Sequence, residues 1–182
     1  DKIGRRRLDT HFLGLQKLGA SFDYDDDTNQ FNIQADKLTG AYILMDEISV
    51  TGTANVVMAA VLAKGTTQLY NAACEPYLQQ LCNMLNRMGA KISGIGSNLL
   101  HIEGVEKLTG TTHTLLPDMI EIGSFISLAA MTQSELRIKN ARVDQLGIIP
   151  FVFERMGVKL IFEQDDIIVP AQEEYEIQSF MD

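Results

Sequence analysis

The chain has 182 residues, of which 46% are hydrophobic and 21% are charged, and its formal net charge is −9. These are the values of an ordinary globular protein with a buried core, so we exclude disorder for most of the chain. The acidic excess also excludes a sequence-nonspecific nucleic-acid binder, because the one basic run, Arg5-Arg6-Arg7, is too short to follow a phosphate backbone.

Apolar runs and cysteines indicate the compartment. The longest apolar run, residues 56–63, is far shorter than the about 20 residues of a membrane-spanning helix, so we expect no membrane segment. Residues 1–20 open with charges and lack the apolar core of a signal peptide. Only Cys74 and Cys82 could form a disulfide. We therefore expect a cytoplasmic protein.

Three segments end in the same way, which indicates an internal repeat. The endings are Leu18-Gly19-Ala20, Met88-Gly89-Ala90 and Met156-Gly157-Val158, at nearly equal spacing. A helix-spaced apolar stripe precedes each of them, and glycine often closes a helix. Each ending therefore predicts the C-terminus of a helix.

The first element in the chain is the helix that Gly19 closes, with apolar residues at Leu8, Phe12 and Leu15. Two runs typical of strands follow at residues 21–24 and 30–34, around a polar turn. The chain therefore enters a repeat unit at its last helix and hairpin.

A complete unit begins at Leu38-Thr39-Gly40. Its pattern predicts a strand, a helix at 51–63, a strand at 67–70, a helix with apolar Leu78, Leu81 and Leu85, and strands at 91–93 and 99–103. The order of this unit is β-α-β-α-β-β. Its first helix is apolar nearly all round, so we expect it to be buried, and the amphipathic second helix should cover it.

A second start, Leu108-Thr109-Gly110, repeats this order. It predicts a strand, a helix at 118–131, a strand at 135–139, a helix with apolar Ile148, Phe151 and Val152, and strands at 159–162 and 166–169. The chain ends at Phe180-Met181-Asp182 without a closing signal. We therefore expect a fragment of a longer repeat protein.

Several residues that could carry chemistry fit structural roles instead. The acidic run at 23–27 reads as a hairpin turn, because Thr28 and Gln34 stand where an EF-hand needs glycine and a bidentate acid. Cys74 and Cys82 have no histidine near them in sequence, so we expect no metal site. We expect His11, His101 and His113, spread over a helix and two strands, to be structural.

Two stretches indicate a phosphorylated ligand. In residues 1–11 a glycine loop with arginines runs into a helix start and combines guanidinium groups with helix-terminal N–H groups. In residues 45–55 a strand end passes through Ser49, Thr51 and Gly52 into a helix, and such a turn presents N–H groups and hydroxyls to anions. The alternatives are an exposed basic helix start and an ordinary helix cap.

Groups of residues spread colinearly over almost the whole chain carry a resemblance to a known family. They are Asp1-Lys2-Ile3-Gly4 with Arg6 and Asp9; Ser49-Val50 with Gly52-Thr53 and Asn55; Ala59-Ala60-Val61-Leu62-Ala63 with Gly65-Thr66-Thr67; Asn71-Ala72-Ala73 with Glu75-Pro76; Gly89-Ala90-Lys91-Ile92; Ile102-Glu103-Gly104-Val105; and Leu116-Pro117-Asp118 with Ile120-Glu121 and Gly123. With these residues the sequence resembles the UDP-N-acetylglucosamine 1-carboxyvinyltransferase family, the enolpyruvyl transferases of peptidoglycan synthesis.

The resemblance implies an α/β fold of a particular kind, an inside-out α/β barrel built from repeated β-α-β-α-β-β units, of which this chain is a part. Residues 1–116 would form most of the domain with the catalytic loop and nucleotide-sugar contacts. Residues 117–182 would form the first unit of a second domain. The fragment alone should be inactive, and its uncovered apolar edges should allow it to self-associate.

The resemblance also implies the reaction and its residues. The enolpyruvyl group of phosphoenolpyruvate would pass to the 3-hydroxyl of UDP-N-acetylglucosamine with release of phosphate, and no cofactor is implied. By alignment Asp1 stands where most members have a cysteine, so Asp1 is the implied proton donor. The implied substrate-binding residues are Arg6, Arg7, Leu8, Asp9, Thr10, Ser49 and Val50.

The sequence departs from the family pattern at several of these places. Arg7 replaces a proline, Thr10 a leucine and Glu47 a lysine seen in some members, while Cys74 and Met119 stand in place of common arginines. An aspartate at position 1 also lacks the thiolate that an epoxide inhibitor alkylates, so we expect insensitivity to fosfomycin. Two rival readings are the related transferase that acts on shikimate 3-phosphate and a non-catalytic nucleotide-sugar-binding relative.

Overall fold

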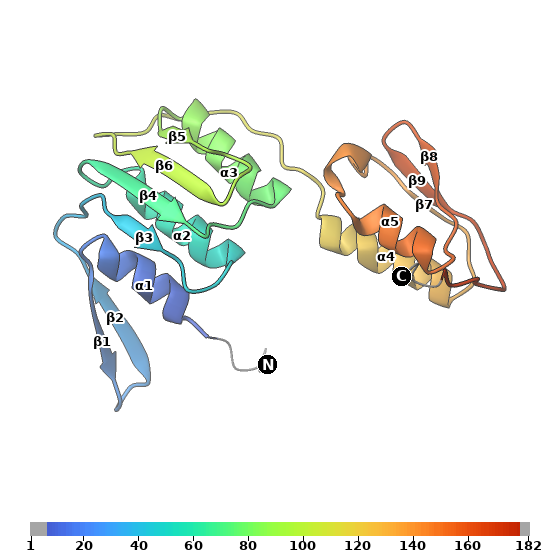
Figure 1. The fold of residues 1–182 in the computed structure, drawn as a ribbon, viewed down its shortest axis with the longest axis horizontal. Helices are drawn as coiled ribbons and strands as arrows, with labels where there is room; N and C mark the ends of the chain where they lie inside the picture. The colour runs from blue at the N-terminus through green and yellow to red at the C-terminus, as the bar shows by residue number, and fades with distance from the viewer. Residues whose placement is uncertain (1–6, 179–182) are drawn as a thin grey trace. The chain divides into compact units, whose positions relative to one another are not determined.

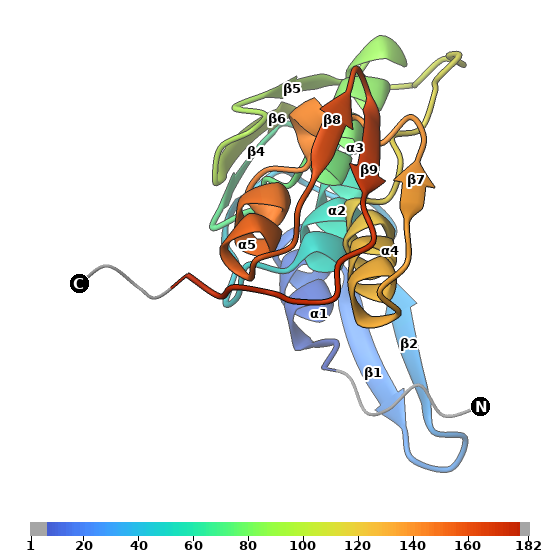
Figure 2. The ribbon, with the colours of Figure 1, turned by 90° about the vertical axis from the view of Figure 1, so that its right-hand side faces the viewer.

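The structure is a computed structural model that describes residues 7–178. The chain divides into two compact units, residues 1–114 and 115–182, and each is described by itself. Both units are mixed α/β (Figures 1 and 2). Asp1 and Arg6, two of the implied site residues, lie outside the described residues.

The first unit contains three helices and six strands in its described part. They are α1 (Asp9–Lys17), β1 (Ser21–Asp25), β2 (Gln30–Gln34), β3 (Tyr42–Leu44), α2 (Val50–Ala60), β4 (Thr66–Tyr70), α3 (Pro76–Arg87), β5 (Lys91–Ser93) and β6 (Leu99–Glu103). A four-stranded sheet has the order β3-β4-β6-β5, in which β3 and β4 are parallel and the other pairs antiparallel. β1 and β2 form a separate antiparallel hairpin.

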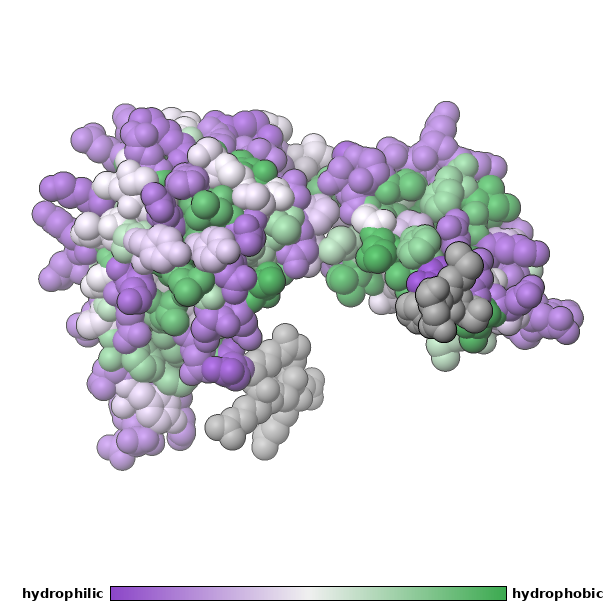
Figure 3. Space-filling model, in the orientation of Figure 1, coloured by the Kyte–Doolittle hydropathy of each residue, from purple (hydrophilic) through white to green (hydrophobic). Residues whose placement is uncertain are grey.

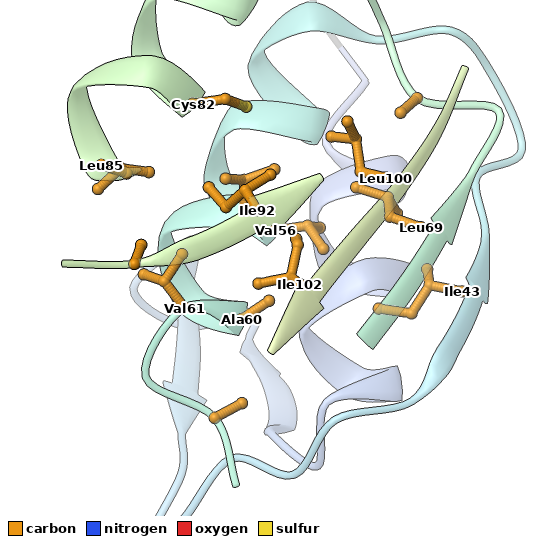
Figure 4. Close-up of a cluster of buried hydrophobic side chains, with 14 of the residues drawn as sticks. Ile43, Val56, Ala60, Val61, Leu69, Cys82, Leu85, Ile92, Leu100 and Ile102 are labelled. Carbon is orange, nitrogen blue, oxygen red and sulfur yellow. The ribbon is translucent and has the colours of Figure 1, made fainter. Parts of the chain in front are cut away.

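The core of this unit lies between the sheet and the helices α2 and α3 (Figure 4). Alternate residues of the strands point inward, so Ile43, Leu69 and Ile102 are fully buried, while the strand neighbours of Ile43 and Leu69 are exposed. Val56 and Val57 of α2 complete the contact and are also fully buried. This packing holds the start of α2, which carries the second candidate motif, at the end of β3.

The second unit contains two α-helices, a short 3₁₀ helix and three strands. They are α4 (Met119–Met131), β7 (Leu136–Ile138), η1 (Val143–Gln145), α5 (Ile149–Arg155), β8 (Ile161–Glu163) and β9 (Asp166–Val169). The strands form an antiparallel sheet in which β9 lies between β7 and β8 (Figure 2). Ile122 and Ile126 of α4 pack with Ile167 of β9 in a separate core.

The internal repeat is visible in the order of the strands. The order β4-β6-β5 in the first unit corresponds to β7-β9-β8 in the second. Gly19, Gly89 and Gly157 follow the ends of α1, α3 and α5 with φ of 103°, 102° and 84°, a left-handed conformation that suits glycine. The predicted glycine at the end of each helix is therefore confirmed.

One predicted strand, after Gly110, is wrong. No strand occurs between β6 and α4, where the structure describes every residue. Instead, this segment bonds to side chains of α3, because Gln80 Nε2 donates to the carbonyl of Thr114 over 3.2 Å and Arg87 contacts His113. A strand needs a neighbouring ladder, and here the polar groups find partners on a helix. His113 consequently lies in an extended segment and not in a strand.

The expected burial of the first helix of each unit is also wrong in part. On α4 the exposed fractions of Ile120, Leu128 and Met131 are 61%, 53% and 85%. Met58 of α2 is 47% exposed. Within each unit only one face of these helices is covered. Apolar residues are visible on the surface of the second unit over α4 and α5 (Figure 3).

The predicted apolar stripe of α5 lies on the exposed side of the helix. Ile148, Phe151 and Val152 are 68%, 55% and 42% exposed, whereas Ile149 and Phe153 pack against the core. Both groups have helical spacing, so periodicity alone could not select between them. The contact of Ile149 and Phe153 with α4 decides the side that is buried.

Candidate functional site

In the first candidate motif, an ion pair joins Arg7, which precedes helix α1, to Asp9 in the first turn of the helix. The Arg7 Nε lies 2.8 Å from Asp9 Oδ2, and the two side chains are 75% and 63% exposed. The hydrogen bond with Asp9 is the main cause that raises the pKa of Arg7, and the same bond lowers the pKa of Asp9. Leu8 precedes the helix at its N-cap and provides no side-chain cap. The pair therefore places one guanidinium at the start of α1.

The second candidate motif forms the N-terminus of helix α2. Ser49 is the N-cap, and its Oγ accepts a hydrogen bond from the N–H of Gly52 over 3.1 Å. The hydroxyl of Thr53, which is fully buried, donates to the carbonyl of Ser49 and accepts from the N–H of Ala73. The first N–H groups of a helix have no intrahelical acceptor, so those of Val50 and Thr51 are available to an anion.

Thr10 connects the two motifs. Its side chain is 3% exposed, and its Oγ1 lies 2.8 Å from Asp46 Oδ1 and 3.2 Å from Glu47 Oε1. Its methyl group packs at α2, where a β-carbon on Gly52 would lie 3.1 Å from Thr10 Cγ2. The hydroxyl is therefore committed to the turn before α2.

His11 forms a second connection between the same helices. Its two ring nitrogens meet Thr51 Oγ1 at 3.3 Å and Asn55 Nδ2 at 2.7 Å. Because an amide nitrogen donates, Nδ1 of His11 is the acceptor of this contact. Sequence reasoning treated His11 as structural, and no sequence signal pairs it with Asn55 across the 44 positions that separate them.

The charges around these connections are mixed. Asp46 and Glu47 immediately precede the α2 N-terminus, and both act on Arg7 electrostatically in the direction that raises its pKa. Their negative charge opposes a phosphate at the start of α2, whereas the helix dipole and Arg7 favour it. An anion at the start of α2 should therefore bind more weakly when the two carboxylates point towards it than when they point away.

A cleft of about 1200 Å³ adjoins the start of α1. Arg7, Leu8 and Asp9 line one side, and Phe12, Phe22 and Phe31 line another. The three phenylalanine rings contact one another with centroids 4.4–5.5 Å apart, and Phe22 stacks on both Phe12 and Phe31.

The internal repeat explains the apolar part of this cleft. The equivalent hairpin, β5 and β6, carries Ile92, Leu100 and Ile102, which are buried in a core with residues of α2 and α3 and are at most 6% exposed. Phe31 and Ile33 of β2 are 47% and 45% exposed. We therefore interpret the face formed by Phe12, Phe22 and Phe31 as a core surface. The part of the cleft suited to a ligand is then the polar side with Arg7 and Asp9.

The two motifs are neighbours because α1 packs on α2, and the contacts between them run through Thr10 and His11. Arg7, Leu8 and Asp9 line the cleft beside Phe22 and Phe31, and Ser49 and Val50 form the start of α2. Sequence reasoning missed the contact between Thr10 and Asp46. Within residues 7–178, no group of three or more His, Cys, Asp or Glu side chains could hold a metal ion. In the same range no helix is long and apolar enough to cross a membrane.

Comparison with known proteins gives a consistent family match. Residues 1–180 match the family described as EPSP synthase (3-phosphoshikimate 1-carboxyvinyltransferase). A UDP-N-acetylglucosamine 1-carboxyvinyltransferase of Bacteroides thetaiotaomicron is 70% identical over 182 residues, which are 100% of this chain and 42% of the relative. The protein of that name from Porphyromonas gingivalis is 62% identical over the same shares. The chain thus spans well under half the length of these relatives.

Two solved structures share the fold. The enolpyruvyl transferase NikO from Streptomyces tendae has a TM-score of 0.81 at 20% identity, covering 93% of this chain and 43% of that one. An EPSP synthase from Acinetobacter baumannii has a TM-score of 0.67 at 19% identity, covering 91% and 40%. At such identities the likeness concerns the fold alone. It confirms the expected fold class, that of the enolpyruvyl transferases.

Proposed function

The chain belongs to the EPSP synthase (3-phosphoshikimate 1-carboxyvinyltransferase) family, and from this premise we propose that it is part of an enolpyruvyl transferase acting on UDP-N-acetylglucosamine. The enzyme would transfer the enolpyruvyl group of phosphoenolpyruvate to the 3-hydroxyl of the sugar and release phosphate. This is the first committed step of peptidoglycan synthesis. The free thiols of Cys74 and Cys82 fit the reducing cytoplasm in which we place the reaction.

One observation carries the choice of acceptor. The relatives that are 70% and 62% identical over the whole chain are both named for UDP-N-acetylglucosamine. The solved EPSP synthase, whose name refers to the shikimate substrate, is only 19% identical. The nucleotide sugar is therefore the better-supported acceptor, and shikimate 3-phosphate is the alternative to be tested.

In the proposed reaction the 3-hydroxyl of the sugar loses its proton and its oxygen bonds to C2 of phosphoenolpyruvate, while the C2–C3 double bond becomes single and C3 gains a proton. The tetrahedral adduct then loses a proton from C3, and the C2–O bond to phosphate breaks. We assign Asp1 as the proton donor at C3 by the resemblance, although it lies outside the described residues. A carboxyl group can serve near neutral pH only if burial or substrate charge raises its pKa.

The described residues would hold the nucleotide sugar. Arg7 offers a guanidinium fork to a phosphate, and the N–H groups at Val50 and Thr51 offer hydrogen bonds at the start of α2. Ser49 shapes this turn because its Oγ is bound to Gly52. Arg6, Leu8 and Asp9 complete the set on the first motif by the resemblance. Thr10 could contact a ligand only through its backbone, since its hydroxyl is engaged.

The test is phosphate release by the full-length polypeptide expected to contain this chain. Release should require both phosphoenolpyruvate and UDP-N-acetylglucosamine, and Asp1→Asn should abolish turnover while nucleotide-sugar binding persists. Release with shikimate 3-phosphate instead would establish the rival acceptor. Binding of the nucleotide sugar without any release by the wild type would establish a non-catalytic relative.

Fosfomycin provides an independent test of the assignment at position 1. The inhibitor alkylates a thiolate, and a carboxylate is a much weaker nucleophile towards an epoxide. The full-length enzyme should therefore keep its activity during incubation with fosfomycin. Asp1→Cys should become sensitive, and mass spectrometry should then find the adduct on residue 1. Labelling of wild-type Asp1 would contradict the assignment.

A further inference from the structure

Thr10 occupies an unusual place for a residue of a binding motif. It lies in the first turn of α1, yet its side chain is 3% exposed and directed at the turn before α2. Its Oγ1 has two carboxylate partners, Asp46 at 2.8 Å and Glu47 at 3.2 Å. A hydroxyl has one proton, so it donates to one carboxylate at a time. The Thr10 hydroxyl can therefore donate to either acid of the turn.

The two acids that Thr10 contacts lie just before the N-terminus of α2. Asp46 and Glu47 precede the N-cap Ser49 by only a few residues, and the backbone folds back so that the N–H of Ser49 donates to the carbonyl of Glu47 over 3.0 Å. Ser49 Oγ already satisfies Gly52. The N–H groups of Val50 and Thr51, in the first turn of α2, have no intrahelical acceptor and so could donate to a carboxylate that leaves Thr10. Such a carboxylate would also be attracted by the positive end of the helix dipole.

We propose that Thr10 is a positioning residue, whose hydroxyl holds Asp46 and Glu47 against α1 and so keeps the first N–H groups of α2 open to the phosphates of the nucleotide sugar. Without the hydroxyl, the carboxylates compete with the ligand for the same donors. This inference rests on the proposed function, because it concerns binding of UDP-N-acetylglucosamine. Both acids also attract Arg7 electrostatically, but the hydrogen bond of Arg7 is with Asp9.

The two halves of the Thr10 side chain can be tested separately. Thr10→Val removes the hydroxyl and keeps the methyl group that packs at Gly52. Thr10→Ser keeps the hydroxyl and removes that methyl group. A matched control is Thr132→Val, because the hydroxyl of Thr132 bonds only to carbonyls of its own helix in the second unit.

The measurement is the Kd of UDP-N-acetylglucosamine for the full-length protein by titration calorimetry. Thr10→Val should raise the Kd about tenfold, which corresponds to one lost hydrogen bond. Thr10→Ser should retain most of the affinity, and Thr132→Val should bind as the wild type does. Unchanged affinity of Thr10→Val would overturn the inference. Absence of binding by the wild type would overturn the proposed function instead.

Removal of the carboxylates distinguishes competition from a structural role. The double variant Asp46→Asn, Glu47→Gln should bind at least as tightly as the wild type, because the competing charges are gone. Adding Thr10→Val to this double variant should then cost little affinity. An equal tenfold loss in both backgrounds would mean that the hydroxyl only stabilises the fold. If Thr10→Val does not fold, weaker binding by the double variant alone overturns the inference.

Discussion

Gly14 of α1 and Val56 of α2 lie so close that a β-carbon on Gly14 would be 2.1 Å from Val56 Cγ2. One turn earlier in each helix, Thr10 and Gly52 are also in contact. The two helices approach closely over these two turns because glycine provides one partner of each contact. This approach places the start of α1 beside the serine-capped turn of α2.

Gly14→Ala should therefore destabilise the protein. Neither helix can accept the added methyl group without moving, and overpacking of this kind costs about 1–3 kcal/mol. Chemical denaturation of the full-length protein measures the change. Gly110→Ala is the control, because no atom lies within 4 Å of its added carbon. Equal stability of Gly14→Ala and wild type would show that the helices separate readily.

Thr53→Val should destabilise the α2 N-terminus. The fully buried hydroxyl donates to the carbonyl of Ser49 at 2.6 Å and accepts from the N–H of Ala73 at 3.0 Å. Valine has the same shape but leaves that N–H buried without a partner, at a cost of about 1–3 kcal/mol. Thr53→Ser keeps both hydrogen bonds and should lose less stability than Thr53→Val. Thermal unfolding of the two variants side by side measures the difference.

Asp144 should titrate at an unusually low pH. Hydrogen bonds from Arg142, and next from Gln145, lower the pKa of Asp144 to about 2 from its ordinary value of 3.8. A lowered pKa in the folded state favours folding above pH 3.8, and this contribution is lost as the pH falls towards 2. NMR titration of the carboxyl carbon measures the midpoint.

Arg142→Gln should return the pKa of Asp144 towards its ordinary value. High salt should act in the same direction, because both side chains are largely exposed and their attraction is screened. Arg137→Gln is the control, since Arg137 pairs with Glu163 and Asp166. A midpoint that does not move in Arg142→Gln would refute the ion pair as the cause.

The two cysteines should differ sharply in reactivity. Cys74 is exposed, whereas Cys82 is 1% exposed and burial raises the pKa of its thiol to about 11. Iodoacetamide at about pH 8 should alkylate Cys74 alone, because the thiolate is the reactive form. In native Cys74→Ser the peptide that contains Cys82 should remain unlabelled, and denaturant should expose Cys82. Mass spectrometry of the native protein counts the labels; rapid labelling at Cys82 would contradict its burial.

Local pattern was sufficient to predict most elements of the fold. Glycines at the ends of α1, α3 and α5, and alternation in the hairpins, placed the helices and strands close to where they are found. These signals depend only on the backbone preferences and spacing of neighbouring residues. The family resemblance rests on motifs of the same local kind.

Contacts between distant residues were decided by the tertiary structure. The stretch after Gly110 has the sequence of a strand but lacks a neighbouring ladder and instead bonds to α3. On α5 two apolar stripes had helical spacing, and only packing on α4 selected Ile149 and Phe153.

The candidate site illustrates the same division. The sequence by itself determined that residues 1–11 and 45–55 are suited to a phosphorylated ligand, because residue types and helix starts are local properties. It contained no signal that Thr10 would bond to Asp46, which lies 36 positions away. That contact exists because Gly14 and Gly52 allow α1 and α2 to pack closely, and such packing is a property of the folded chain alone.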